Sequence, residues 1–562
     1  MKWNLRLLLV AGFFLAGILT FYGSWDSALM DPDEARYAEA SREMIEQKSF
    51  IVPIFNYAPR LNKPIFFYWL QIISYSLFGV NEFAARLPSM MAGLGSLLLV
   101  FLIARLLCGQ LHGNRIGSLS LFICFTNLLY FVFSKVGTLD VVLLFFFTLL
   151  IYFFLKAEAS RIQSKGLHVI LLFASLGFAF LTKGPVGVVL PFLIVMFYLL
   201  LRRFLFVPER SSLSSPFSWK SMLAGLAVFL AIVAPWGFVL MAKVGVSNVI
   251  SLIQTETALR YFIGFDHPQP FYFYIPLFLA GFFPWSAFFF VAGYRKIRSA
   301  LGKLSFQGED PFLERRQDLF LLIWFAIPII FFSFSGSKLP GYILPALPPA
   351  SIIIASEWHR SMEKAKAIKR NWLLISGFLI AVVVLLAFLI SGFLILGRHP
   401  DFRTLLFFTF YTIVLFLLLI AMNIVLPQSL RSSYLAGSTV VFGILFFMGM
   451  NLFAMPEIQK IRSARDLALG SIRKYEGSSL ISYRYQIPSL VFYSRRKVEL
   501  ARNEEELVRL AGELARPLII VNELNFIGMA VELKEKLEVQ ETAGEFILLT
   551  PKREDPPGSG GI

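Results

Sequence analysis

The sequence predicts an α-helical polytopic membrane protein with a small α/β domain near its C-terminal end. Hydrophobic residues make up 57% of the 562 residues, and the mean hydropathy is +0.70. That apolar content exceeds the roughly 45–50% usual in soluble domains. Apolar stretches of about 20 residues, the length that crosses a bilayer, recur along most of the chain. They end near residue 457, where short apolar runs begin to alternate with polar helical segments.

Thirteen apolar stretches are candidate membrane spans. The first follows Lys2, contains Arg6 and has no small-residue cleavage site after it, so we expect a retained span rather than a removed signal peptide. We also expect re-entrant or surface-lying helices at 32–47 and 64–77. The thirteen candidates are 4–22, 82–104, 116–131, 139–155, 167–182, 185–201, 222–242, 271–292, 318–335, 340–357, 372–396, 404–426 and 434–454.

The positive charges predict the orientation of these spans. Lys and Arg gather in alternate loops, and such loops remain in the cytoplasm. The other short loops hold single charges beside Gly or Pro, so we expect them to face outward together with the C-terminal domain, in a multi-pass protein of the inner (plasma) membrane. The cytoplasmic set is Arg105, Arg115, Lys156, Arg161, Lys165, Arg202, Arg203, Arg210, Lys220, Arg295, Lys296, Arg298, Arg315, Arg316, Arg360, Lys364, Lys366, Lys369 and Arg370.

The chain is predicted to divide into a membrane domain at 1–456, an extracytoplasmic α/β domain at 457–552 and a flexible tail at 553–562. The tail, DPPGSGGI at its end, is rich in Gly and Pro. Short β-prone runs alternate with helical segments in the α/β domain. The expected strands are Leu480–Tyr483, Pro517–Val521 and Phe546–Thr550, and the expected helices are Asn503–Ala511 and Ala530–Leu537.

Composition excludes several classes of function. The net charge of +16 lies mostly in loops between spans rather than on one aqueous face, which argues against a nucleic-acid partner. The two cysteines, Cys108 and Cys124, cannot form a disulfide framework or a CxxC metal site. No GxxxxGK[ST] segment is present, which argues against nucleotide hydrolysis.

Ionisable side chains at membrane level are costly and usually functional. With the predicted orientation, those on the outer side carry both signs, as expected of a site that binds an anion and contains a base. They come from distant parts of the chain and comprise Asp31, Asp33, Glu34, Lys63, Lys135, Asp140, Lys183, His267 and Lys338.

The segment MDPDEARYAEASREMI contains the strongest candidate. Asp31 at an N-cap, Pro32 at the first helical position and Glu34 at the third would form a capping box. At 100° per residue, Arg36, Glu39, Arg42 and Glu43 gather on one face, which we expect to be wet. Asp33 falls on the apolar side with Tyr37, Ala40 and Met44. Helix capping does not account for Asp33, so we assign it a functional role.

The other outer-side residues each have an ordinary structural explanation. Lys63 could lie along apolar surface with its ammonium in water. Lys183 and Lys338 sit at Gly/Pro breaks, where a lysine suits a helix C-terminus, and Asp140 suits a helix N-terminus. His267 has no second histidine nearby, which makes it a weak metal ligand on its own.

The motifs resemble those of a known family. PDEARYAEASREM, IVPIFN, LNKPIFFYWLQ, SLFG and ARLPS resemble the first outer loop of the 4-amino-4-deoxy-L-arabinose lipid A transferase group. GTLD, LTKG, PFYFYIP with PW, and SKLPGYILPALPP follow in the same order. That group belongs to the GT-C glycosyltransferases, together with the protein O-mannosyltransferases. The resemblance covers essentially all the predicted spans and implies a GT-C fold of about 13 transmembrane helices followed by a small extracytoplasmic α/β domain.

The resemblance implies an enzyme that takes a sugar from a polyprenyl-phosphate carrier and passes it to an acceptor outside the inner membrane. It makes Asp33 the catalytic carboxylate, with Asp140 as a second acid, and Lys63 a ligand of the donor phosphate. Lys183 and Lys338 match basic positions around the cavity. Near them we place Glu34 among the catalytic residues, Arg36 among the phosphate ligands, and Tyr37, Tyr342 and Asn62 in the cavity. His267 falls near a histidine that some relatives place by a metal, so a divalent metal stays open.

Asn62 is a departure, because close relatives have an acid immediately before the lysine. If that acid helps to hold a metal in the relatives, Asn62 changes the metal site of this chain. If the acid helps to recognise the positive charge of an amino sugar, Asn62 changes the specificity for aminoarabinose.

Chemistry favours direct, inverting displacement, with Asp33 as the base and lysines neutralising the leaving phosphate. The expected acceptor is lipid A or another envelope glycolipid. A protein O-glycosyltransferase or an envelope-polysaccharide transferase is the alternative within the superfamily. A lipid-linked sugar transporter is the alternative in another class, although the predicted spans lack charges at their centres.

Overall fold

The computed structural model describes residues 5–159, 162–205, 217–264, 267–301, 311–363, 403–425, 431–475 and 477–552. Two compact units emerge from it. The first comprises Met1–Ser24, Leu61–Leu70 and Arg86–Phe453; the second comprises Trp25–Arg60, Gln71–Ala85 and Ala454–Ile562. The predicted span 372–396 and the predicted tail 553–562 lie outside the described residues.

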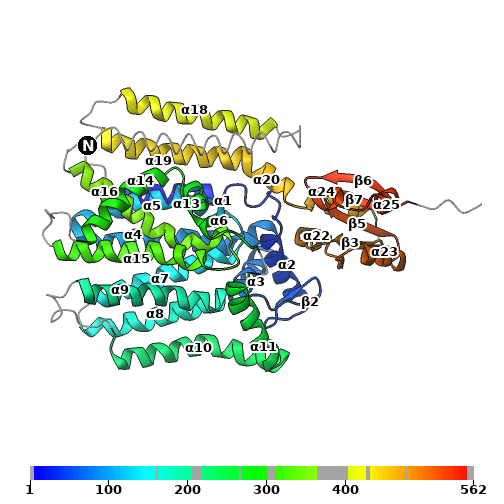
Figure 1. Ribbon diagram of the computed structural model, residues 1–562, viewed down its shortest axis with the longest axis horizontal. Coiled ribbons are helices and arrows are strands. Elements are labelled where there is room, and N and C mark those ends of the chain that lie inside the picture. The colour runs from blue at the N-terminus through cyan, green and yellow to red at the C-terminus, as the bar shows by residue number, and fades with distance from the viewer. Residues whose placement is uncertain are drawn as a thin grey trace, which may run out of the picture. The chain divides into compact units, whose positions relative to one another are not determined.

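The first unit, called here the helical unit, is built from long apolar helices joined by shorter helical segments (Figure 1). α7 packs against α8 and α8 against α10, while α14, α15 and α16 pack on one another. Its elements include α1 (Leu5–Phe21), α5 (Gly109–Phe125), α6 (Leu128–Lys135), α7 (Leu139–Ala159), α8 (Ile162–Lys183), α9 (Val186–Leu205), α10 (Trp219–Val244), α11 (Val246–Ile253), η2 (Gln254–Leu259), α12 (Arg260–Phe262), η3 (Phe271–Phe273), α13 (Tyr274–Gly281), α14 (Ser286–Ala300), α15 (Pro311–Ser333), η4 (Pro340–Ala346), α16 (Leu347–Glu363), α18 (Arg403–Val425) and α19 (Arg431–Gly449), followed by η5 (Met450–Ala454).

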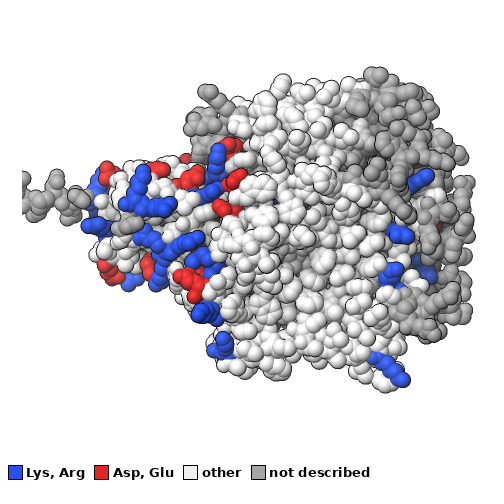
Figure 2. Space-filling model, turned by 180° about the vertical axis from the view of Figure 1, so that it is seen from behind, with Lys and Arg blue, Asp and Glu red and all other residues white. Residues whose placement is uncertain are grey.

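Within the described residues, seven helices are long and apolar enough to cross a membrane, or nine if each sharply bent pair counts as one span. The bent pairs are α5 with α6, at 70°, and α13 with α14, at 113°. The visible described surface of the helical unit carries few charged side chains (Figure 2). These findings confirm a polytopic helical protein, while the count of thirteen spans stays a prediction.

The second unit, called here the mixed unit, combines part of the first loop with the C-terminal region. It contains α2 (Asp33–Glu46), the hairpin of β1 (Ile54–Phe55) and β2 (Ala58–Pro59), α20 (Met455–Ile461), α21 (Arg465–Leu467) and η6 (Ala468–Ile472). α3 (Phe66–Phe78) and α4 (Glu82–Leu107) contribute residues to both units. The helices expected at 32–47 and 64–77 are thus confirmed as α2 and α3.

A five-stranded sheet forms the C-terminal part of the mixed unit. Its order is β4-β3-β5-β7-β6, with β3 parallel to β4 and β5, and β7 antiparallel to β5 and β6. The three predicted strands are confirmed, and the sheet adds β4 and β6. The elements are β3 (Ser479–Tyr483), α22 (Pro488–Ser494), β4 (Val498–Ala501), α23 (Glu504–Glu513), β5 (Pro517–Asn522), α24 (Glu523–Ile527), α25 (Val531–Glu535), β6 (Leu537–Ala543) and β7 (Phe546–Pro551).

Candidate functional site

Lys63 is the centre of a charged group in the helical unit. Its Nζ lies 2.7 Å from Oε2 of Glu256. The same carboxylate accepts hydrogen bonds from the Asn62 amide and the Arg260 guanidinium, each at 3.0 Å. Burial lowers the pKa of Lys63 below its usual value although Glu256 opposes the change. Burial alone would raise the pKa of Glu256, but Lys63 and Arg260 outweigh it and hold that pKa below its usual value.

Glu256 and Arg260 were not predicted as site residues. Glu256 lies in η2, a π-helical turn between α11 and α12. Such turns occur frequently at functional sites. Glu256 and Arg260 stand four residues apart, a spacing that pairs opposite charges on a helix. That spacing was visible in the sequence, but nothing in it indicated that the pair would meet the loop of Lys63.

A second charged group joins the ends of α7 and α8. Asp140, at the N-terminal end of α7, accepts a hydrogen bond from Nζ of Lys183, the last residue of α8. The Lys183 ammonium also lies 4.4 Å from the centre of the Tyr342 ring. Gly184 follows with φ of +70°, a left-handed conformation typical of the residue after a helix end. A Cβ on Gly341 would come within 2.9 Å of Asp140 Cγ, so glycine permits this close packing.

The two groups are neighbours. The charges of Lys183 and Arg260 both act on the Tyr342 hydroxyl. The charge of Lys183 also contributes to the lowered pKa of Lys63. Three cations, Lys63, Lys183 and Arg260, therefore share the region with two carboxylates, and the local balance is positive.

A cavity of about 300 Å³ opens beside these charges, and we call it the lysine cavity. Its polar end is lined by Asn62, Lys63, Lys183 and Glu256. Its remaining wall is apolar and comes mainly from α10 and α11, with residues such as Val233, Trp236, Phe238, Met241, Leu252 and Ile253. A basic end with an apolar wall suits a ligand that has a phosphate and a hydrocarbon tail.

Lys338 and His267 form a different arrangement in the same unit. The Lys338 ammonium donates to the backbone carbonyls of Gln269 and Ser335, and the Lys338 amide donates to the carbonyl of His267. Lys338 is buried and joins two loops, whereas His267 is exposed. No group of three or more His, Cys, Asp or Glu side chains within the described residues is arranged to hold a metal ion. Asp266, the neighbour of His267, lies outside the described residues.

The motif residues of the first loop belong to the mixed unit. Asp33 is the first residue of α2, its side chain is 46% exposed, and Arg36 donates to it at 3.4 Å. Glu34 is buried and accepts a hydrogen bond from the backbone amide of Met30 at 2.8 Å. Tyr37 is buried, with the Arg60 guanidinium 5.7 Å from its ring centre. The structure thus leaves Asp33 accessible.

The predicted capping box is wrong for Asp31. Pro32 occupies the N-cap position, with no side-chain capping bond. The Asp31 carboxylate instead accepts hydrogen bonds from the backbone amide and the hydroxyl of Ser489, at the start of α22. Burial raises the pKa of Asp31 to about 7, against the lowering effect of the Ser489 bonds. Asp31 therefore joins the first loop to the C-terminal region within the mixed unit.

The predicted wet face of α2 is also wrong. Glu39, Arg42 and Glu43 are buried. Arg42 donates two hydrogen bonds to Glu39 at 2.7 Å and another to Glu46 at 2.6 Å. Burial raises the pKa of Glu43 to about 8. Helical periodicity separates polar from apolar faces, but a polar face can be buried when its charges neutralise one another.

Comparison with known proteins agrees with this architecture. Residues 3–248 match the family model described as dolichyl-phosphate-mannose-protein mannosyltransferase. The crystal structure of ArnT from Cupriavidus metallidurans bound to undecaprenyl phosphate matches with a TM-score of 0.74 at 22% identity, covering 98% of each chain. The chain therefore has the fold of this ArnT structure. The matches confirm the predicted fold class and agree with the family resemblance seen in the motifs.

Two curated relatives extend the comparison. A protein of Aquifex aeolicus is 28% identical over 541 residues, 93% of this chain and 96% of the relative. The undecaprenyl phosphate-α-4-amino-4-deoxy-L-arabinose arabinosyl transferase of Edwardsiella ictaluri is 30% identical over 404 residues. That match covers 67% of this chain and 65% of the transferase, slightly less than two thirds of its length.

Proposed function

We propose that this protein is a GT-C glycosyltransferase that moves a hexose or pentose from a polyprenyl-phosphate carrier to a membrane glycolipid acceptor. The observation that carries the proposal is the lysine cavity, where Lys63 and Lys183 stand at one end of an apolar wall. Guided by the relatives' names, we take undecaprenyl phosphate as the carrier. Lipid A or another envelope glycolipid is the acceptor, ahead of a protein.

The proposed reaction needs two tasks, which we assign to different residues. Lys63, Lys183 and Arg260 neutralise the donor phosphate, and the α10 and α11 wall takes the first part of its hydrocarbon tail. Buried cations stabilise a developing phosphate charge strongly because little water competes with them. Glu256 and Asp140 hold these cations in place before the donor arrives. Asn62 fixes one oxygen of Glu256, so a carboxylate still stands beside Lys63 although residue 62 is not acidic.

Asp33 is the proposed base. In a direct displacement, the acceptor oxygen attacks the anomeric carbon and gives its proton to the Asp33 carboxylate. The bond from that carbon to the phosphate oxygen breaks, and the phosphate leaves with the electron pair. Glu34 orders the turn before α2 and Arg36 orients Asp33. A phosphate neutralised by lysine and arginine leaves readily, so no step in this sequence is routed through a metal.

The orientation and domain boundaries complete the proposal. The distribution of positive charge among the loops supports a location of the site and of the C-terminal α/β domain on the outer side of the inner membrane. Residues 1–456 form the membrane domain and 457–552 the extracytoplasmic domain. Residues of the first loop contribute to the same compact unit as the latter.

The test uses purified protein with a polyprenyl-phosphate sugar and an acceptor lipid. Acceptor-dependent consumption of the donor supports a transferase, whereas movement of intact donor across vesicles without consumption would identify a transporter. Asp33→Asn should abolish transfer while donor binding persists, and retained turnover would remove Asp33 as the base. Lys63→Ala should weaken donor binding, and unchanged affinity would remove Lys63 from the phosphate site.

A further inference from the structure

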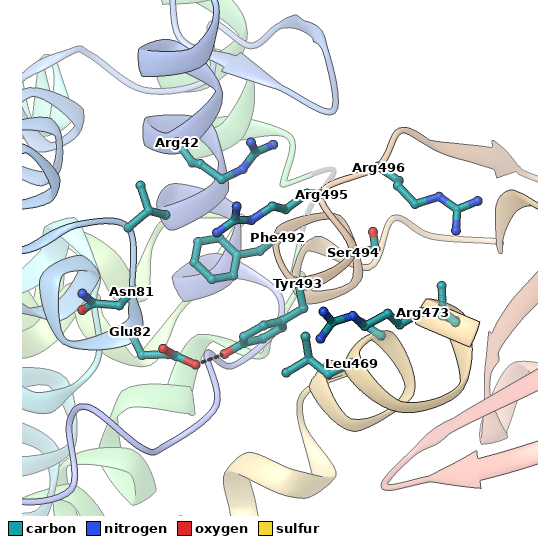
Figure 3. Close-up of a pocket in the computed structure, with 13 residues that line it drawn as sticks. Arg42, Asn81, Glu82, Leu469, Arg473, Phe492, Tyr493, Ser494, Arg495 and Arg496 are labelled. Carbon is teal, nitrogen blue, oxygen red and sulfur yellow. Dashed lines mark hydrogen bonds between the residues drawn. The ribbon is translucent and has the colours of Figure 1, made fainter. Parts of the chain in front are cut away.

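A second pocket lies wholly within the mixed unit, and the proposed reaction makes no use of it (Figure 3). It has a volume of about 590 Å³, and we call it the arginine pocket. Its residues come from α2, the α3–α4 turn, η6 and the end of α22. They are Arg42, Val80, Asn81, Glu82, Ala468, Leu469, Ile472, Arg473, Phe492, Tyr493, Ser494, Arg495 and Arg496.

The pocket has an excess of positive charge. Arg42 is already neutralised by Glu39 and Glu46. The single pocket carboxylate, Glu82, accepts from the Tyr493 hydroxyl at 3.1 Å and lies 3.7 Å from Arg465. Within the part of the chain that the structure describes, Arg473, Arg495 and Arg496 form no ion pair; Arg496 donates to Ser478 at 3.1 Å.

Two further observations point to a ligand. Buried hydroxyl groups normally have a hydrogen-bond partner, but the Ser494 Oγ is buried and has none among the described residues. Next to it, Arg495 has φ of 53° and ψ of 34°, a left-handed conformation that is uncommon for arginine. Such conformations occur at helix ends and recur at binding sites. Both features occur where α22 ends at the pocket.

The size and chemistry of the pocket select the class of ligand. Planar guanidinium groups match phosphate oxygens in pairs. A volume of about 590 Å³ is far larger than one phosphate needs and is in the range of small-molecule sites. Asn81, Ser494 and the Phe492 and Tyr493 rings add the amide, hydroxyl and aromatic surfaces that suit sugar rings (Figure 3). The pocket lacks the long apolar wall of the lysine cavity, so it does not suit a hydrocarbon tail.

We propose that the arginine pocket binds a phosphate-bearing saccharide head group. Arg473 and Arg495 bind the phosphate, and the side chains around Ser494 contact the sugar. The head group could belong to a glycolipid or to a soluble sugar phosphate. Naming it as the acceptor's head group rests on the proposed function, whereas the binding itself does not.

The test measures binding to the full chain in nanodiscs of neutral lipid. The probes are trehalose 6-phosphate, trehalose, inorganic phosphate and a phosphorylated disaccharide glycolipid added to the nanodisc. We expect binding of the sugar phosphate or the glycolipid, stronger than that of either trehalose or inorganic phosphate. Binding of the glycolipid alone identifies a lipid source, and binding of both identifies the shared head-group chemistry.

The variants are Arg473→Gln and Arg495→Asn, each expected to weaken binding at least tenfold. Asparagine tolerates the left-handed conformation, so Arg495→Asn removes the charge without new backbone strain. Arg516 is an exposed arginine of the same unit with φ of 47° that does not line the pocket. Arg516→Asn is therefore the matched control and should leave binding unchanged.

Equal affinity in wild type and both pocket variants would overturn the proposal, as would an equal loss in Arg516→Asn. Binding of inorganic phosphate or of trehalose that equals binding of the sugar phosphate and of the glycolipid would overturn it too. Donor binding, measured in parallel with a polyprenyl phosphate, should stay unchanged in the pocket variants. If the pocket variants weaken head-group binding but the protein transfers no sugar, the proposed transferase function is wrong and the proposed binding site is supported. If the protein transfers sugar but the pocket variants bind the head group as tightly as wild type, only the proposed binding site is wrong.

Discussion

Glu256→Gln is the most informative change in the lysine cavity, because Glu256 has two opposing effects on donor binding. Its carboxylate opposes the lowering of the Lys63 pKa by burial and so favours the protonated form, which attracts a phosphate. It also occupies Lys63 and Arg260, so an incoming phosphate must compete with it. Glutamine keeps the size of the side chain and removes the charge.

The two effects dominate at different pH. A hydrogen bond to a charged group contributes about 1.5–3 kcal/mol, and one pKa unit corresponds to about 1.4 kcal/mol. Loss of the carboxylate should therefore lower the pKa of Lys63 further, because burial already lowers it and Glu256 is the main opposing charge. A protonated lysine attracts phosphate and a neutral one does not, so affinity falls as pH rises through this pKa. Below it, the variant should bind at least as tightly as wild type, because the competing carboxylate is gone.

The assay is donor binding at constant ionic strength between pH 6 and 10. A non-reacting polyprenyl phosphodiester is the ligand, since a diester keeps a single charge where a phosphate monoester titrates near pH 6. Trp236 lines the cavity and provides a fluorescence signal. The alkaline loss of binding should occur about 1–2 pH units lower in Glu256→Gln than in wild type. Adding Lys63→Arg should abolish the loss, because arginine stays protonated. An identical midpoint in wild type and Glu256→Gln would refute the reasoning.

Three further changes test other parts of the structure. Burial raises the pKa of Asp31 from 3.8 to about 7, so the folded state holds the Asp31 proton more tightly than the unfolded state does. The stability of the fold should therefore fall as pH rises from about 4 to 7. Asp31→Asn should flatten that part of a profile of melting temperature against pH, and an unaltered slope would contradict the prediction. Asp318→Ala leaves the buried Lys296, 2.6 Å away, without its nearest carboxylate and should cost about 3–5 kcal/mol in thermal or denaturant unfolding, with Asp318→Asn milder. Gly341→Ala should displace Asp140 from Lys183. The rate of transfer should then fall at least about tenfold, which corresponds to the loss of roughly one hydrogen bond between charged groups. Gly437→Ala is the control, because a Cβ at Gly437 meets open space and should leave transfer unchanged.

Hydropathy predicted the helical architecture well but did not reveal its breaks. The stretch 116–131 reads as one span, yet Asn127 caps a new helix there and the two segments meet at 70°. The stretch 271–292 is likewise split into α13 and α14. A capping residue inside a strongly apolar run produces little change in hydropathy, so composition alone hides it. In the sheet, β4 and β6 were not predicted. Both strands are partly exposed, and their polar residues interrupt the alternation of apolar and polar positions by which a strand is predicted.

The motifs predicted which residues gather in the lysine cavity only in part. Lys63 and Lys183 line it, with Asp140 and Tyr342 beside Lys183, as predicted. Lys338 has the same residue type and a similar Gly/Pro setting, yet its ammonium is bound by two backbone carbonyls. A lysine between two loops can bind either a ligand or the loops themselves, and the sequence does not encode which carbonyls come near.

The lysine cavity and the arginine pocket should respond differently to salt. In the cavity, Lys63 and Lys183 are largely buried, and each has a carboxylate partner. A bound phosphate therefore replaces a carboxylate as the partner of each lysine, in a region that salt ions hardly enter. In the pocket, Arg473 and Arg495 are exposed and have no carboxylate partner among the described residues, so their charge is available to solution ions. Screening lengths shrink from about 30 Å at 0.01 M salt to about 3 Å at 1 M, and exposed charges are screened far more than buried ones. Raising the salt over this range should therefore weaken sugar-phosphate binding strongly and phosphodiester binding only slightly. Equal salt dependence at the two sites would mean that the cavity is as open to solvent as the pocket, which would remove the buried-lysine argument for the donor site.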